Sequence, residues 1–146
     1  MILFEGSFVS DFHYYLNFLQ PLSIVLCQNR ISSNKHEIDE ILTHEFTHFY
    51  DVQTLRLDLQ DCRNLAYSEV RAARHAECAS SFRMLQPYCT KQKAIAATKN
   101  LFPAPQARKC IQAVFDQAFA DVRPFHSSSS TTVNNSNGGA AGGTSP

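Results

Sequence analysis

The sequence lacks the features that mark several large classes of protein. It has no run of the roughly 18 apolar residues that a membrane-spanning helix needs. Its 13 basic and 13 acidic residues cancel, so no overall positive field favours nucleic acid as a partner. The N-terminus has neither the apolar core of a signal peptide nor the arginine-rich, acid-poor character of a transit peptide. Composition therefore leaves one globular domain and gives no cellular address.

The spacing of the cysteines gives no metal-binding motif. The five cysteines are widely spaced and include no C-x-x-C pair. They are Cys27, Cys62, Cys78, Cys89 and Cys110. Two disulfides with one leftover thiol would fit an oxidising compartment, whereas five thiols would fit a reducing one. The sequence does not decide between these alternatives.

Only part of the chain is expected to fold. Residues 127–146 consist almost wholly of Ser, Thr, Asn, Gly and Ala, and such a segment cannot bury enough apolar surface to offset its ordering entropy. We therefore predict a disordered low-complexity tail at 127–146. Before it we expect an N-terminal segment at 1–21 and one folded domain at 22–126, large enough for a modest core.

The most informative feature is a short motif, because residues 44–48 read His-Glu-Phe-Thr-His. This is the H-E-x-x-H pattern of zinc metallopeptidases. Residues four apart lie on one face of a helix, so His44 and His48 can bind one Zn²⁺ through neutral imidazole nitrogens. Glu45 then lies beside the metal, where it can take a proton from a water molecule that attacks a peptide carbonyl. The alternative is a plain helical domain that binds no zinc.

The residues around the motif predict the helix that this chemistry needs. Asn34 and Glu37 resemble a helix-capping pair. Apolar residues then recur at helical spacing and predict one apolar face on a helix from about Asn34 to Leu55. These residues are Ile38, Ile41, Leu42, Phe46 and Phe49.

A third ligand is required, because a catalytic zinc usually has three protein ligands and one open position. We predict Glu69, which lies 21 residues after His48 on the next expected helix. The alternative is a glutamate on a solvated helix face. Asp51, a rival candidate three residues after His48 on the same helix, could also orient an imidazole N–H. The other rival candidates are His75, Asp58 and Asp61.

Further polar residues near Glu69 receive weaker interpretations. Tyr67 and Arg71 could each donate a hydrogen bond to a developing oxyanion, although most arginines so placed are structural. The remaining histidines have no metal-ligand spacing and are expected at the surface. They are His13, His36 and His126.

The other elements complete an α+β, mainly helical domain. Residues 22–31 are the best strand candidate; the edge of this strand could hold an extended substrate, or the strand could simply pack. A second helix is expected from Asp61 or Asn64 to Met84, ended by Pro87, and a third from 91 to 100. The last helix ends before Pro124 and carries an apolar stripe. The stripe consists of Ile111, Val114, Phe115, Ala118, Phe119 and Val122. We thus expect a zincin-like metallopeptidase domain, with a short N-terminal β element and an H-E-x-x-H active-site helix.

Four stretches in order carry a resemblance to a known family. Residues 23–31 read SIVLCQNRI, 42–51 read LTHEFTHFYD, 68–73 read SEVRAA and 121–125 read DVRPF. Together they resemble the mitochondrial inner-membrane metalloproteases that mature and help assemble ATP synthase subunit a. By this resemblance His44 and His48 match the family's metal-binding histidines and Glu45 its catalytic glutamate. The segment around Glu69 is similar to a family motif, which favours Glu69 as the third ligand.

The resemblance also implies a function and a location. It implies a zinc endopeptidase that removes the propeptide of ATP synthase subunit a, bound peripherally to the mitochondrial inner membrane on the intermembrane-space side. It further implies a role in ATP synthase assembly that need not use the zinc. The alternative function is therefore a non-catalytic assembly factor or chaperone, whose metal site is dispensable or vestigial.

Overall fold

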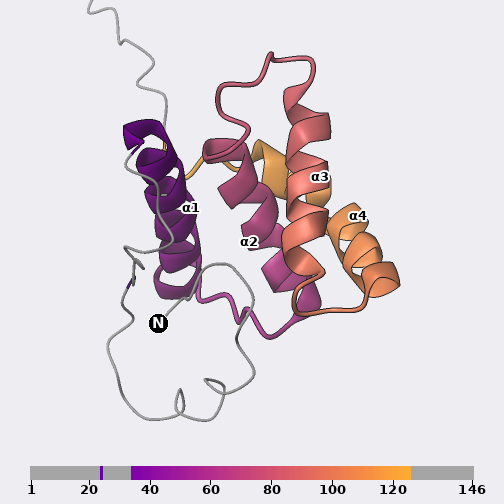
Figure 1. Cartoon of the computed structure of the whole chain (residues 1–146). Coiled ribbons are helices and arrows are strands. Elements are labelled where there is room, and N and C mark those ends of the chain that lie inside the picture. Colours follow the sequence, from indigo (N-terminus) through magenta and orange to yellow (C-terminus); the bar gives the residue numbers. More distant parts are fainter. Residues whose placement is uncertain (1–23, 25–33, 126–146) are drawn as a thin grey trace, which may run out of the picture.

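Four α-helices form the described part of the chain, residues 24 and 34–125 of a computed structural model. They are α1 (Lys35–Gln53), α2 (Cys62–His75), α3 (Gln86–Thr98) and α4 (Ala104–Ala120). Consecutive helices run in opposite directions, and α2 lies between α1 on one side and α3 and α4 on the other (Figure 1). Among these helices α1 packs against α2 alone.

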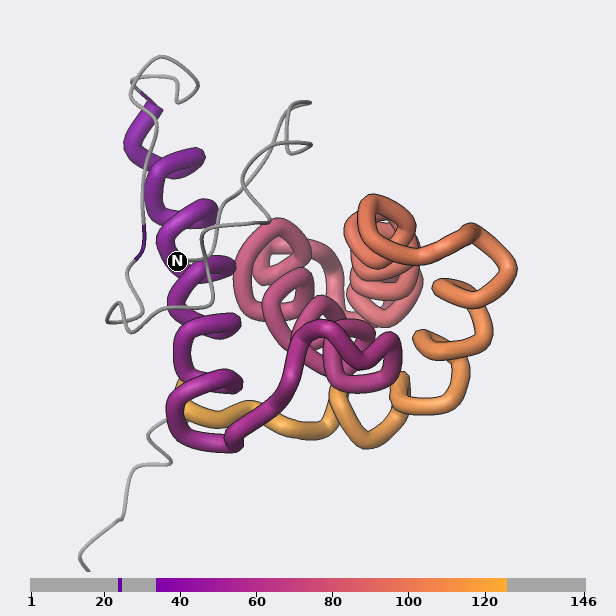
Figure 2. Tube along the Cα trace, turned by 90° about the horizontal axis from the view of Figure 1, so that it is seen from below, coloured from indigo at the N-terminus to yellow at the C-terminus, as the bar shows by residue number. Residues whose placement is uncertain are grey.

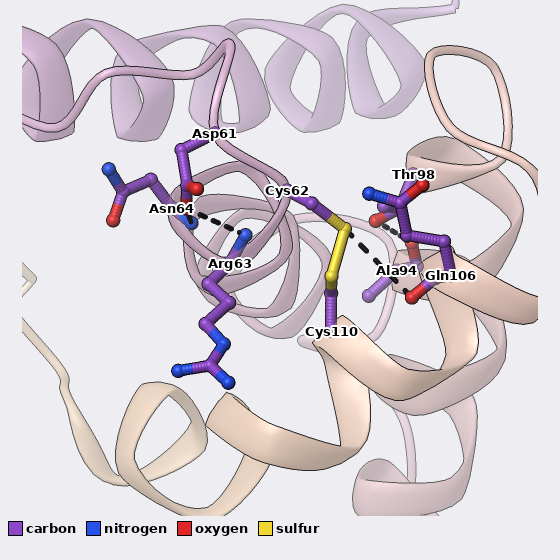
Figure 3. Close-up of a disulfide and its surroundings, with 8 residues drawn as sticks. All are labelled: Asp61, Cys62, Arg63, Asn64, Ala94, Thr98, Gln106 and Cys110. Atoms are coloured by element: carbon purple, nitrogen blue, oxygen red, sulfur yellow. Dashed lines mark hydrogen bonds between the residues drawn. A yellow bond between two sulfur atoms is a disulfide. The ribbon is translucent and has the colours of Figure 1, made fainter.

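Local chemistry sets where each helix begins. The Asn34 side chain accepts a hydrogen bond from the backbone N–H of His36 and caps α1 as predicted. Asp61 caps α2 by accepting from the backbone N–H groups of residues 63 and 64 (Figure 3). In α3 and α4 a proline, Pro87 or Pro105, lies in the first turn, where its missing N–H has no helical partner to lose.

The second and third helices differ from prediction. The second helix ends at His75 instead of Met84, and the third begins at Gln86 instead of residue 91. Pro87 therefore helps to start α3 and does not end α2. The connection between them is closed by a disulfide from Cys78 to Cys89 on α3, so the chain must turn back where helix propensity alone would continue it.

The apolar core lies between α2, α3 and α4. Its buried members include Val70 of α2 and Ala94 of α3. The predicted stripe of the last helix faces this core, because Ile111 and Ala118 are fully buried. Three more members of the stripe pack against the same cluster: Val114, Phe115 and Phe119.

The face that α1 turns toward α2 is polar, which corrects the predicted apolar face. The buried residues of α1 are His44, Glu45, Thr47, His48 and Asp51. By contrast Phe46, a member of the predicted apolar face, is 53% exposed. Helical periodicity identified the helix and its apolar face, whereas the side that α1 buries is the one that carries the motif.

The predicted strand at 22–31 lies outside the described residues except for Ile24, which takes part in a β-bridge. The segment 1–21 and the tail 127–146 also lie outside them. Within residues 34–125 the structure is helical and has no strand, so the prediction of a mainly helical domain is confirmed there. None of the helices described combines the length and apolar character needed to cross a bilayer.

The described residues contain two disulfides, which agrees with the first of the two cysteine alternatives. One links Cys62 at the start of α2 to Cys110 in α4 (Figure 3), and the other links Cys78 to Cys89. Cys27 lies outside the described residues. The first disulfide closes a long loop, since its cysteines are 48 residues apart. It therefore constrains the unfolded chain strongly.

We predict that the double variant Cys62→Ala/Cys110→Ala unfolds with a free energy about 4 kcal/mol lower than that of oxidised wild type, the chain-entropy value for a loop of this length. The measurement is chemical denaturation followed by far-ultraviolet circular dichroism. Wild type in reducing buffer is the control and should also lose stability. A double variant as stable as oxidised wild type would show that this disulfide does not stabilise the fold.

Candidate metal centre

The three predicted ligands lie together between α1 and α2. His44 and His48 project from adjacent turns of α1, and their Nε2 atoms are 3.0 Å apart. Glu69 projects from α2, with Oε2 3.6 Å from His44 Nε2 and Oε1 3.7 Å from His48 Nε2. All three side chains are buried. Their ligand atoms lie within 4.8 Å of one another, so the group could hold a metal ion.

A serine and a carboxylate orient the ring of His48. The Ser68 hydroxyl donates to Asp51 Oδ2 at 2.7 Å, and it lies 2.7 Å from His48 Nδ1. A hydroxyl has one proton to donate, so Ser68 accepts the second hydrogen bond from the Nδ1–H of His48. The Nε2 atom of His48 then carries the lone pair that a metal needs.

A second carboxylate does the same for His44. Glu77 Oε2 lies 3.2 Å from His44 Nδ1, and an ionised carboxylate only accepts. Nδ1 therefore carries a proton, and the Nε2 atoms of His44 and His48 point into the same space. At their separation of 3.0 Å, a proton on one Nε2 or a cation bound by both prevents the two lone pairs from repelling each other.

The carboxylate of Glu69 supports the same conclusion. Its Oε2 is buried and has no hydrogen-bond partner in the described part of the chain, and leaving a buried polar group unsatisfied is costly. Two imidazole nitrogens and a carboxylate oxygen are a donor set that zinc accepts. The residues present thus fit a bound metal cation.

Burial governs the protonation of the ligands. It raises the pKa of Glu69 to about 7, with His44 opposing and Glu77 adding to the shift. Burial also lowers the pKa of His48 well below its usual value, helped by His44 and Arg71. For His44 burial lowers the pKa, but the hydrogen bond that it donates to Glu77 and the charges of nearby carboxylates outweigh this effect, and the pKa is raised. A metal bound here displaces protons from Glu69 and His44.

Glu45 is next to the ligand His44 in the sequence but does not belong to the group that could hold the metal. Its side chain is 2% exposed, and neither carboxylate oxygen has a hydrogen-bond partner among the described residues. Burial raises the pKa of Glu45 to about 7; the carboxylates of Glu69 and Glu77 add to this, and His44 opposes it. A carboxylate with this pKa can both accept and release a proton near neutral pH.

The contacts of His48 continue into a buried ionic network. Asp51 forms an ion pair with Arg71 of α2, and both side chains are fully buried. Arg71 also donates to the backbone carbonyl of Arg123 and lies 3.5 Å from Asp121 Oδ2. Figure 2 shows the segment after α4 returning beneath α2 toward α1. The network therefore joins α1, α2 and the chain after α4.

The other residues singled out in the sequence have different places. Asp51 acts on His48 through Ser68, in keeping with the predicted orienting role. His75 lies against the ring of Phe125 at 4.8 Å, and Asp61 caps α2. Asp58 accepts a hydrogen bond from the backbone N–H of Gln60. None of these three rivals belongs to the metal group.

Neither predicted oxyanion donor faces the metal group. Tyr67 donates its hydroxyl proton to Asp121 at 2.8 Å, and Arg71 is engaged in the ionic network. Of the histidines expected at the surface, His36 is exposed, while His13 and His126 lie outside the described residues.

Sequence reasoning missed two residues, Ser68 and Glu77. Ser68 could have been suspected because it directly precedes Glu69 on the same helix. For Glu77 there was no signal, because its approach to His44 depends on α2 ending at His75.

Comparison with known proteins places this site in a family. The model of the peptidase M76 family matches residues 10–126. A relative named mitochondrial inner membrane protease ATP23, from Candida albicans (strain SC5314), is 31% identical over 131 residues, covering 80% of this chain and 55% of the relative. The protein of the same name from Scheffersomyces stipitis is 33% identical over 116 residues, covering 70% of this chain and 48% of the relative.

A third relative of that name, from Saccharomyces cerevisiae (strain YJM789), is 30% identical over 125 residues, covering 74% of this chain and 55% of the relative. The chain spans about half the length of the curated relatives it matches. No solved structure matches it. The extent of the family match and the buried His-His-Glu group agree: the chain belongs to the peptidase M76 family.

Proposed function

We propose that this chain is a zinc-dependent endopeptidase, with His44, His48 and Glu69 as zinc ligands and Glu45 as the catalytic residue. The observation that carries the proposal is the buried arrangement of two imidazole Nε2 atoms and a carboxylate, with both imidazole Nδ1 atoms held by hydrogen bonds. A zinc ion held there supplies Lewis-acid chemistry, because it polarises the scissile carbonyl and lowers the pKa of a water molecule.

The proton transfers belong to Glu45. Its carboxylate takes a proton from the attacking water and delivers it to the amine that leaves. A pKa of about 7 suits both steps, since a group near the working pH accepts and releases protons with similar ease. Ser68 and Glu77 hold the imidazoles in the tautomer that presents Nε2.

We propose a hollow beside α1 as the entrance for substrate. It lies between the first half of α1 and residues 75–80, and its lining includes Thr43 and Ala76. The metal ligands do not line it, but Thr43 directly precedes the ligand His44, and Ala76 directly precedes Glu77.

The substrate and location follow from the relatives and the resemblance. The relatives are named as mitochondrial inner membrane proteases, and we propose that the domain at 22–126 acts on the propeptide of ATP synthase subunit a. We place it as a peripheral protein on the intermembrane-space side of the inner membrane. The two disulfides support this location, because disulfides persist in oxidising compartments.

We predict that Glu45→Gln keeps its zinc but cleaves a peptide spanning the propeptide junction about 100- to 10,000-fold more slowly, the range for loss of a general base. Steady-state cleavage is measured by mass spectrometry, and Asp116→Asn on the exposed side of α4 serves as the matched control. Cleavage by Glu45→Gln at the wild-type rate would contradict the mechanism. If wild type is also inactive but Glu45→Gln restores ATP synthase assembly in a null strain, the assembly-factor alternative is favoured.

We predict that Ser68→Ala weakens zinc binding by about 10- to 100-fold, the usual cost of removing a partner that orients a metal ligand. The His48 ring loses the acceptor for its Nδ1–H, and Asp51 loses a donor. Zinc affinity is measured by competition with a chromogenic chelator, with Ser80→Ala on the exposed surface as the control. Equal affinities for wild type and a folded Ser68→Ala would mean that Ser68 does not position His48.

A further inference from the structure

Four large apolar side chains protrude from the connection between α2 and α3 and from the first turn of α3. Exposure is 82% for Phe82, 92% for Met84, 59% for Leu85 and 69% for Tyr88. We call these four residues the apolar tip. Figure 1 shows this connection rising beyond the ends of α2 and α3. Exposed apolar clusters of this kind usually mark an interaction surface.

The apolar tip is held in place by covalent and polar contacts. The disulfide between Cys78 and Cys89 closes the loop that carries it. The Gln86 side chain donates to the carbonyl of Cys78 at 3.2 Å. Within the loop the backbone N–H groups of Leu85 and Gln86 both donate to the carbonyl of Phe82. The apolar side chains therefore point outward from a fixed turn.

The stretch of sequence that carries the apolar tip is basic. From Cys78 to Phe115 the sequence has no acidic residue, although acidic and basic residues are equal in number over the whole chain. Six basic residues lie in that stretch: Arg83, Lys91, Lys93, Lys99, Arg108 and Lys109. Arg83 lies between Phe82 and Met84 of the tip, and Lys91 and Lys93 lie within about two turns of Tyr88 on α3. In the described part of the chain none of these three forms an ion pair within 4.0 Å. Lys91 lies 5.4 Å from the centre of the Phe115 ring, and Lys93 helps to lower the pKa of Glu77.

We propose that the apolar tip docks into the interface of an anionic phospholipid bilayer, with Arg83, Lys91 and Lys93 against the lipid headgroups. Apolar side chains that enter the headgroup region and cations that meet a negative surface act together in such binding. The tip is a projection and not a groove, so its shape suits a flat bilayer surface. The positive charges of Arg83, Lys91 and Lys93 complement the negative charge of anionic lipid headgroups.

Docking in this way would bring the candidate active site close to the membrane. The loop leaves α2 through Glu77, which contacts the ligand His44. Two and three residues further along the loop, Ala79 and Ser80 line the hollow proposed as the substrate entrance. Only five positions separate Glu77 from Phe82. Substrate segments that emerge from a bilayer would thus meet the hollow, but lipid binding itself does not depend on the proposed peptidase activity.

The test is co-sedimentation of the full 146-residue chain with vesicles of phosphatidylcholine containing about 30% phosphatidylglycerol, to supply negative charge. We expect binding to these vesicles and little binding to pure phosphatidylcholine. The double variant Phe82→Ser/Met84→Ser should bind at least about tenfold more weakly, because two apolar side chains no longer leave water. Leu101→Ser is the matched control, since Leu101 is 61% exposed but lies beyond the opposite end of α3.

The charged part of the surface is tested with single variants. Arg83→Gln should weaken binding to the anionic vesicles about fivefold, the effect of one basic residue near such a surface. Lys99→Gln, at the opposite end of α3, should bind like wild type. Glu45→Gln should also bind like wild type, so loss of peptidase activity and loss of docking can be told apart.

Several outcomes would overturn the proposal. Wild type that fails to bind anionic vesicles, or binds neutral vesicles equally well, excludes an anionic bilayer as the partner. A tip variant that binds like wild type excludes the tip as the docking surface. If the tip variant instead loses only self-association in sedimentation velocity, the surface is an interface between copies of the chain.

Discussion

The buried ion pair between Arg71 and Asp51 is the interaction on which the arrangement of α1 depends. Among the four helices α1 contacts only α2, and the face it buries is polar. Apolar packing alone therefore does not hold it in place. The Arg71 guanidinium instead meets Asp51 from α1, and Asp121 and the Arg123 carbonyl from the segment after α4. Removing one partner of such a pair leaves an uncompensated buried charge, which typically costs about 3–5 kcal/mol.

The Arg71 network is also part of the site. The second oxygen of Asp51 accepts the hydroxyl proton of Ser68, which in turn orients His48. Stability and ligand geometry thus share the same few side chains, and a change at Arg71 should disturb both. The aromatic rings of Tyr50 and Tyr67 lie 5.6 Å and 5.8 Å from the guanidinium carbon. At these distances both rings support the guanidinium through cation–π attraction.

The acidic groups near the ligands explain why the site favours a cation. The charges of Glu69 and Glu77 raise the pKa of Glu45, and the charge of Glu77 raises the pKa of Glu69. A divalent cation held by His44, His48 and Glu69 would offset this repulsion, would replace the protons on Glu69 and His44, and would meet two imidazole lone pairs at the same time. The same argument makes metal binding a contribution to folding, because the ligands come from both α1 and α2.

Some of this could be predicted from sequence because it is local. The spacing of His44 and His48 fixes their common face on any helix, and Asn34 is a helix cap by its own chemistry. The stripe of α4 follows from periodicity, since that helix packs on an apolar core. The placement of Glu69 opposite the histidines required only that the next helix run antiparallel.

What could not be predicted depends on long-range contacts. Periodicity indicated an apolar face on α1, but it did not indicate that α1 buries its polar side, where Arg71 and Ser68 of α2 meet it. The end of α2 could not be found from helix propensity, because the chain turns where Cys78 pairs with Cys89. Disulfide pairing itself is not encoded in cysteine spacing. The role of Glu77 depends on that turn.

The most direct test of the central claim is the zinc-to-protein ratio of purified wild type and Glu69→Gln, measured by elemental analysis after dialysis against a weak chelator. We predict one zinc per chain in wild type. We predict that Glu69→Gln loses most of its zinc while its helical content stays unchanged. Folded wild type without zinc, or Glu69→Gln that retains a full equivalent, would contradict a three-ligand site built from His44, His48 and Glu69.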